Sequence, residues 1–176
     1  MLIKINEVIK MFRPMRRSKQ QLSDKRVSEI LENGKTGILA VNGDNGFPYT
    51  VPVNYVYFNG KIYIHCAKEG HKIDAIKANN KVSFCVIDSD EVFAEKLTTL
   101  YRSAVVFGKA EILNEKDKIE QAVTALGLKY NPDREFIEKE ISKFIDTMCC
   151  IEITPSHITG KEAVELSVRQ TKTPQC

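Results

Sequence analysis

One stretch decides the fold of this chain: residues 63–76, which read YIHCAKEGHKIDAI. An apolar strand pattern ends at Cys66, residues 68–70 form a turn, and a helix is expected to begin at His71. The first turn of a helix presents backbone N–H groups without internal partners and the positive end of the helix dipole. Because His71 and Lys72 fall in that turn, we interpret it as a phosphate-binding turn; the alternative is a lysine that is simply hydrated.

The segment just upstream, residues 48–57, is a strand that contains Pro48 and Pro52. Proline cannot donate a ladder hydrogen bond, so the strand belongs at a sheet edge or at a bulge. Its free backbone groups could pair with a flat heterocycle such as the isoalloxazine of a flavin. The alternative is that the prolines only protect an edge from aggregation. The candidate contacts on this strand are Thr50, Val51, Pro52, Val53 and Asn54.

A third candidate element is residues 100–110, LYRSAVVFGKA. Arg102 interrupts an otherwise apolar strand, and a buried guanidinium must be paired. A phosphate would pair it through two parallel hydrogen bonds, and Ser103 could add a hydroxyl donor. Alternatively, Arg102 points to solvent, because side chains alternate along a strand.

The remaining pattern predicts a mainly β (α+β) domain. Six strands are expected, at residues 36–42, 47–58, 61–66, 82–87, 100–113 and 148–153. Helices are expected at residues 24–33, 71–78, 114–126 and 132–145, and residues 88–99 are interpreted as a polar connection. Short strands joined by hairpins, of which Asn59-Gly60 is the best signal, favour a closed antiparallel barrel.

Composition limits the class of protein. The chain has 176 residues, 43% hydrophobic and 28% charged, which suits a single domain at residues 21–168. Residues 1–20 are expected to be a basic arm and residues 169–176 a flexible tail. No apolar run approaches membrane-spanning length and no signal peptide is visible, so a cytoplasmic protein without membrane contact is expected. A net charge of +3 does not suggest nucleic-acid binding.

The sequence shows neither a metal-ligand spacing nor a cysteine placed to act as a nucleophile with a histidine. The five cysteines form no C-x-x-C pair, so we expect reduced thiols and no metal site. His65 and His71 lack a third ligand nearby. His65 and Cys66 are adjacent on a strand, so their side chains point to opposite faces and cannot easily act together.

Taken in order, these motifs resemble the nitroimidazole-resistance proteins of the pyridoxamine 5'-phosphate oxidase-like FMN-binding split-barrel superfamily. The resemblance extends over residues 11–168. The segments that carry it are MFRPMRR (11–17), PYTVPVNY (48–55), IHCAKEGHK (64–72), YRSAVVFGKA (101–110) and ITGKE (158–162).

The resemblance implies an antiparallel six-stranded split β-barrel with flanking helices, forming a homodimer with FMN at the subunit interface. The flavin ring would lie along the proline-bearing strand at residues 51–54, and Arg102 and Ser103 would assist in holding the phosphate. The phosphate-binding residues it implies on the strand-to-helix segment are His65, Cys66, Ala67, Gly70, His71 and Lys72.

The resemblance also implies an activity: reduction of small electrophiles such as nitroimidazole-type nitro compounds, with a reduced nicotinamide or another electron donor. His71 is the candidate catalytic residue, as a proton source or anchor for the electrophile. Pyridoxamine-phosphate oxidases proper carry a substrate-binding Arg-x-His motif, whereas residues 168–170 here are Val-Arg-Gln, which counts against that substrate. The alternative is a flavin- or haem-binding protein without turnover.

Overall fold

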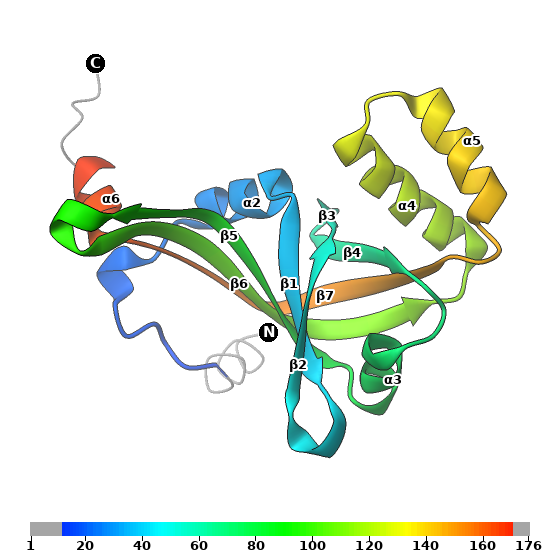
Figure 1. Ribbon diagram of the computed structural model, residues 1–176, viewed down its shortest axis with the longest axis horizontal. Coiled ribbons are helices and arrows are strands. Elements are labelled where there is room, and N and C mark those ends of the chain that lie inside the picture. The colour runs from blue at the N-terminus through cyan, green and yellow to red at the C-terminus, as the bar shows by residue number, and fades with distance from the viewer. Residues whose placement is uncertain (1–11, 171–176) are drawn as a thin grey trace, which may run out of the picture.

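The computed structural model of the chain describes residues 12–170, which contain a seven-stranded antiparallel sheet in the order β2-β1-β5-β6-β7-β4-β3 (Figure 1). The predicted mainly β (α+β) split-barrel class is confirmed, whereas the closed barrel that the hairpin pattern favoured is wrong, because β2 and β3 remain the two edges of the sheet. The sheet curves around its apolar face without closing into a barrel, as a split barrel does. The strands are β1 (Thr36–Asn42), β2 (Pro48–Asn54), β3 (Val56–Phe58), β4 (Lys61–Cys66), β5 (Lys81–Phe93), β6 (Thr98–Leu113) and β7 (Cys149–Glu162).

The core lies between the inner face of this sheet and helix α2 (Asp24–Asn33). Strand residues alternate between buried and less buried, and Leu39, Phe84 and Ile151 are fully buried on the inner face. Helix α2 begins where Ser23 accepts a hydrogen bond from the backbone N–H of Arg26, and its apolar stripe completes the core. Burial of these apolar side chains is the main source of stability.

Helices α4 (Lys116–Tyr130) and α5 (Arg134–Phe144) form a hairpin that is inserted between β6 and β7. The hairpin packs on the sheet through a second apolar cluster, in which Val123 and Ile141 join Leu113 of β6 and Cys150 of β7. A Cβ at Gly127 would lie 2.8 Å from the side chain of Ile137, so glycine permits the two helices to approach closely. Together with α2 and α3 (His71–Ala78), these helices confirm the four predicted from the sequence.

The predicted strand 47–58 is divided at Tyr55 into β2 and β3, which is why the sheet has seven strands rather than six. The Tyr55 backbone N–H donates to the Tyr130 hydroxyl (3.2 Å) instead of to a neighbouring strand. Its side chain is fully buried, and its hydroxyl donates to the carbonyl of Leu31 (2.7 Å). The chain therefore leaves β1 at this residue and joins β4.

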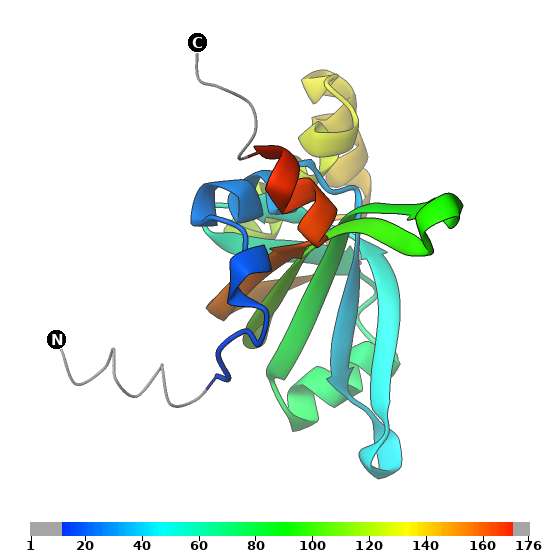
Figure 2. The ribbon, with the colours of Figure 1, turned by 90° about the vertical axis from the view of Figure 1, so that its left-hand side faces the viewer.

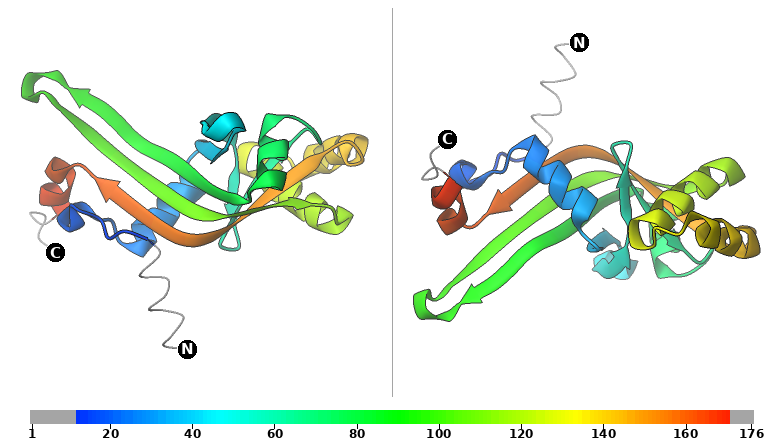
Figure 3. Two further views of the ribbon diagram at one scale, coloured as in Figure 1. Left: turned by 90° about the horizontal axis from the view of Figure 1, so that it is seen from below. Right: turned by 90° about the horizontal axis from the view of Figure 1, so that it is seen from above.

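The second difference is at residues 88–99, where a connection was expected. Strands β5 and β6 instead continue past a bulge between Ile87 and Ser89 as a long ribbon that projects from the barrel (Figure 2). The β5 half of this ribbon is largely exposed on both faces, and the β6 half is partly buried and includes the buried Leu100, so residues 88–99 lack the apolar alternation that signals a strand. The ribbon and the α4–α5 hairpin lie at opposite ends of the molecule (Figure 3).

The expected arm at residues 1–20 and tail at residues 169–176 lie partly outside the described residues, as does Cys176. Within the described part, Ser18–Gln20 form the short helix η1, and the backbone N–H of Leu22 donates to the carbonyl of Gly160. Helix α6 (Val164–Gln170) was not predicted. Between residues 12 and 170, none of the helices combines the length and apolar character that crossing a membrane requires.

Lys129 connects the α4–α5 hairpin to the barrel, and its burial predicts how the stability of the protein depends on pH. Its Nζ donates to the carbonyl of Gly34 (2.6 Å) and lies 4.0 Å from the ring centre of Tyr55. Burial lowers the pKa of Lys129 from 10.5 to about 8. Between these values the unfolded chain binds more protons than the folded one, so this residue makes stability rise with pH. Urea unfolding between pH 8 and pH 10.5 should show that the free energy of unfolding rises less with pH in Lys129→Met than in the wild type. Equal pH dependence of the two proteins would contradict the role of Lys129.

Candidate functional site

The candidate site is the gap where β2 and β4 separate. Strand β3 pairs with β4, and the pairing begins with Val56 opposite Tyr63. If the same register is extended by two residues, Asn54 lies opposite His65. Beyond that point β2 pairs with β1, while β4 pairs with β7. Within the described residues, the facing edges of β2 and of the end of β4 therefore have no strand partner.

The proline-bearing strand has the edge position that the sequence predicted. Tyr49, Val51 and Val53 pack on the core, whereas the alternate residues of β2, from Pro48 to Asn54, are exposed. The prolines lack an N–H and suit the side of the strand that faces away from β1. Backbone N–H and C=O groups point to alternate edges along a strand, and Thr50 is two residues from each proline. Its N–H and C=O therefore point toward the same open edge.

Helix α3 begins beside this edge. Gly70 precedes it with a φ of +118°, a conformation that favours glycine, and its carbonyl accepts from the N–H of Ile73. The imidazole of His71 stacks on the ring of Tyr49, with 4.2 Å between ring centres, and its Nε2 lies 3.6 Å from a carboxylate oxygen of Asp44. His71 thus connects the helix start to β2, and the structure brings these two predicted elements together.

The other residues of the predicted phosphate-binding turn do not all face the gap. Cys66 is half-buried against the core, opposite Cys149 on β7, and burial raises the pKa of its thiol to about 12. The positive charge of Lys72 opposes that rise in the Cys66 pKa, which indicates that Lys72 is close to it. Ala67 and Gly70 are exposed in the turn. The amine of Lys68 points away from the gap and donates to the carbonyl of Asp146.

Cys66 is therefore a neutral core thiol rather than a nucleophile. His65, by contrast, is exposed on the opposite side of β4, as strand alternation predicted. Cys85, Cys149 and Cys150 are also free thiols, in agreement with the expected reduced state of the cysteines.

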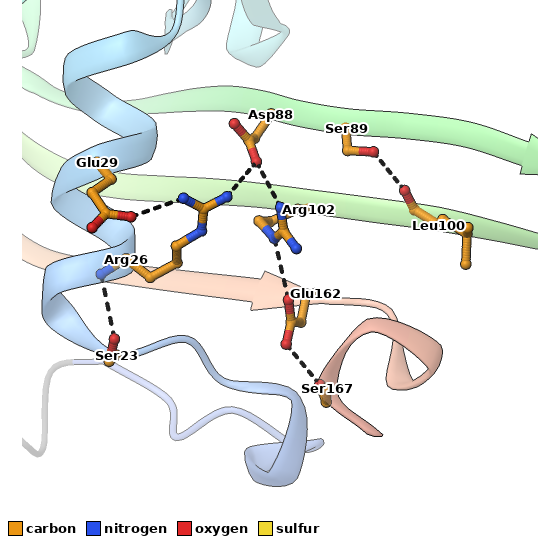
Figure 4. A network of polar contacts seen from close by, with 9 residues as sticks. All are labelled: Ser23, Arg26, Glu29, Asp88, Ser89, Leu100, Arg102, Glu162 and Ser167. Carbon is orange, nitrogen blue, oxygen red and sulfur yellow. Dashed lines mark hydrogen bonds and ion pairs between the residues drawn. The ribbon is translucent and has the colours of Figure 1, made fainter. Parts of the chain in front are cut away.

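Arg102 and Ser103 are not brought to this gap. They lie on β6 opposite Glu162 and Lys161 at the end of β7. Figure 1 shows that this end of β7, next to α6, is far from α3. The Arg102 guanidinium is paired with two carboxylates: Nη1 is 3.1 Å from Asp88 and Nε is 3.2 Å from Glu162 (Figure 4). In the same network Asp88 also accepts from Arg26, and Glu162 from Ser167. Within one chain, Arg102 thus pairs with carboxylates rather than with the phosphate that the sequence suggested as its partner.

A groove not foreseen from the sequence opens beside the gap. It has a volume of about 340 Å³ and lies between the α4–α5 hairpin and the ends of β2 and β4. Asn54 and His65 line its strand side, and Leu126, Ile141 and Phe144 are among the apolar residues on its helix side. The sequence signal was weak, because these helix residues read as an ordinary amphipathic stripe.

An open antiparallel barrel with a helical hairpin between its last two strands defines the class of this protein as a split barrel. The chain belongs to the pyridoxamine 5'-phosphate oxidase family, because the sequence model of that family matches residues 23–162. The match contains β2, the β4–α3 turn and β6. A search of curated proteins gave no match.

Solved structures include several similar folds. An FAD- and haem-binding protein from Mycobacterium smegmatis has a TM-score of 0.68 at 17% identity, covering 88% of this chain and 81% of that one. An FAD-binding protein from Mesorhizobium loti has a TM-score of 0.58 at 24% identity, covering 82% and 97%. A proposed 5-nitroimidazole antibiotic resistance protein from Bacteroides thetaiotaomicron has a TM-score of 0.66 at 21% identity, covering 80% and 85%. At such identities the likeness shows the fold alone.

Proposed function

We propose that this protein binds FMN in the gap between β2 and the β4–α3 turn and reduces small electrophiles, such as nitroimidazole-type nitro compounds. The observation that carries the proposal is the meeting of an open proline-bearing strand edge with a helix start, joined by the stacking of His71 on Tyr49. Membership of the family and the flavin-binding proteins among the similar folds support it.

The residues present fit the chemistry of FMN. The first-turn N–H groups of α3 and the ammonium of Lys72 would hold the phosphate dianion. The backbone of Thr50 is exposed on the open edge of β2 and would pair with the polar edge of the ring. When bound, the flavin supplies the two-electron chemistry, and the protein orients it. The His71 ring, held between Tyr49 and Asp44, would be available to hold or pass a proton at the rim of the gap.

Purification gives the first test. The protein should carry a yellow chromophore, or bind FMN stoichiometrically when the flavin is added to the apoprotein. Loaded protein should then oxidise a reduced nicotinamide when a nitro compound is supplied. Failure to bind FMN would overturn the proposal, whereas tight binding without turnover with any donor would favour a flavin-binding protein that is not an enzyme.

We further propose that the functional unit is a homodimer. The outer face of β1, β5 and β6 has a groove of about 400 Å³ that is lined in part by Ala40, Ser83 and Phe107. Phe12 of the arm already stacks near this face, with 5.4 Å between its ring centre and that of Phe107. A second copy would cover these apolar groups close to β2, whose residue Pro48 lines the same groove.

The dimer is tested by a charge placed on this face. Phe107→Glu should give a monomer by light scattering after size exclusion, and should also lower FMN affinity, because the proposed site lies beside the interface. Phe58→Glu is the matched control, since Phe58 is 41% exposed and Phe107 is 40% exposed. A dimer that survives Phe107→Glu, or a wild-type protein that is monomeric, would contradict the assignment.

A further inference from the structure

The groove between the α4–α5 hairpin and the strands, called here the hairpin groove, has a second wall that the proposed FMN site does not use. Its helix wall is apolar and includes Val123, Leu126, Ile137, Ile141 and Phe144. Its strand wall consists of Asn54 and His65, which also border the proposed flavin gap. A molecule in the groove would therefore lie next to the flavin ring.

Apart from the imidazole of His65, the one charged side chain that the groove lining presents from the α4–α5 hairpin is already paired. Its carboxylate, that of Glu140, is hydrogen-bonded to the amine of Lys143 on the same helix. The hydroxyl of Tyr130 lies 2.5 Å from the carbonyl of Lys35 and accepts from the N–H of Tyr55. A charged ligand would lose hydration here without gaining a counter-charge, so the groove favours an uncharged one.

Two polar groups can nevertheless orient a ligand. One N–H of the Asn54 amide donates to the carbonyl of Lys35 (3.3 Å), which leaves the second N–H available. The exposed imidazole of His65 can add another donor. Two donors on one wall and apolar side chains on the other suit a ring compound that carries oxygen acceptors on its edge. The volume of about 340 Å³ lies at the small end of the range for ligand pockets, which suits one or two fused rings.

We propose that the hairpin groove binds the electron acceptor as an uncharged, flat ring compound of the quinone class. Its role as an acceptor rests on the proposed function, whereas the binding itself does not. The overall reaction balances as reduced nicotinamide, quinone and one proton giving oxidised nicotinamide and hydroquinone. The exposed Phe144 at the end of α5 forms part of the apolar wall, and the donors on β2 and β4 orient the quinone oxygen.

The test is a titration with 2,3-dimethyl-1,4-naphthoquinone, which has no free position on its quinone ring for addition of a thiol. Protein labelled at the methyl groups of Val, Leu and Ile should show shifts at Val123, Leu126 and Ile137, while the barrel core residue Val106 is unchanged. 2-Hydroxy-1,4-naphthoquinone, which has the same two fused rings but is an anion at neutral pH, should bind at least tenfold more weakly. Shifts elsewhere than the groove, or equal binding of the two compounds, would overturn the proposal.

Two variants sharpen the test. Phe144→Glu should weaken binding of the uncharged quinone about tenfold, which is ~1.4 kcal/mol. Phe136→Glu is the control: Phe136 is 48% exposed and Phe144 50%, and both lie four residues from Glu140 on α5, but Phe136 does not line the groove. Equal effects of the two substitutions would contradict a specific site. Quinone binding to protein that fails to bind FMN would remove the proposed function while leaving the groove as a binding site.

Discussion

Lys72→Glu is expected to weaken FMN binding by about 100-fold, or ~3 kcal/mol. Lys72 lies in the first turn of α3 and is only partly exposed, so water would screen the attraction between its charge and the phosphate only in part. The substitution replaces an attraction to a dianion with a repulsion, at the helix end whose own dipole favours an anion. Titration of apoprotein with FMN, followed by the flavin absorbance, measures the change.

Riboflavin separates the phosphate contact from the rest of the site. It lacks the phosphate, so its affinity should change little in Lys72→Glu. Lys77→Glu makes the same change of charge in the last turn of the same helix, where Lys77 is exposed, and should leave FMN affinity within about twofold. Equal losses for FMN and riboflavin would show that Lys72 supports the fold of the turn rather than the phosphate.

The part of the site that the sequence predicted correctly is local. Pro48 and Pro52 required an edge, and β2 is an edge strand. Gly70 required a turn, and α3 begins at His71, directly after it. Each of these features is determined by the conformation of a few neighbouring residues, which is why the sequence alone was sufficient.

The features that were missed depend on contacts between distant segments. Tyr55 divides the predicted strand because the hydroxyl of Tyr130, 75 residues further along, takes its N–H. For Arg102 the sequence left open a phosphate partner or exposure to solvent, whereas its partners are carboxylates from β5 and from the end of β7. A long-range partner leaves no local pattern in the sequence. The hairpin groove was missed for the same reason, because its walls come from separate elements.

Arg102→Met should lower the free energy of unfolding by about 3–5 kcal/mol, because it leaves a buried carboxylate without its counter-ion. The side chain of Glu162 is 4% exposed and that of Arg102 is 16% exposed, so little water can replace the lost partner. The remaining hydrogen bond of Glu162, from the hydroxyl of Ser167 (3.0 Å), does not neutralise its charge. Urea unfolding followed by circular dichroism measures the loss.

Two further variants show whether this cost comes from the unpaired charge. Arg102→Met combined with Glu162→Gln removes both charges and should recover more than half of the lost stability. Arg26→Met removes the other arginine of the network, whose side chain is 36% exposed, and should cost no more than about 1 kcal/mol. If the double variant is as unstable as Arg102→Met alone, the loss comes from packing at the base of the ribbon. If Arg102→Met is as stable as the wild type, the guanidinium is free to serve an external anion after all.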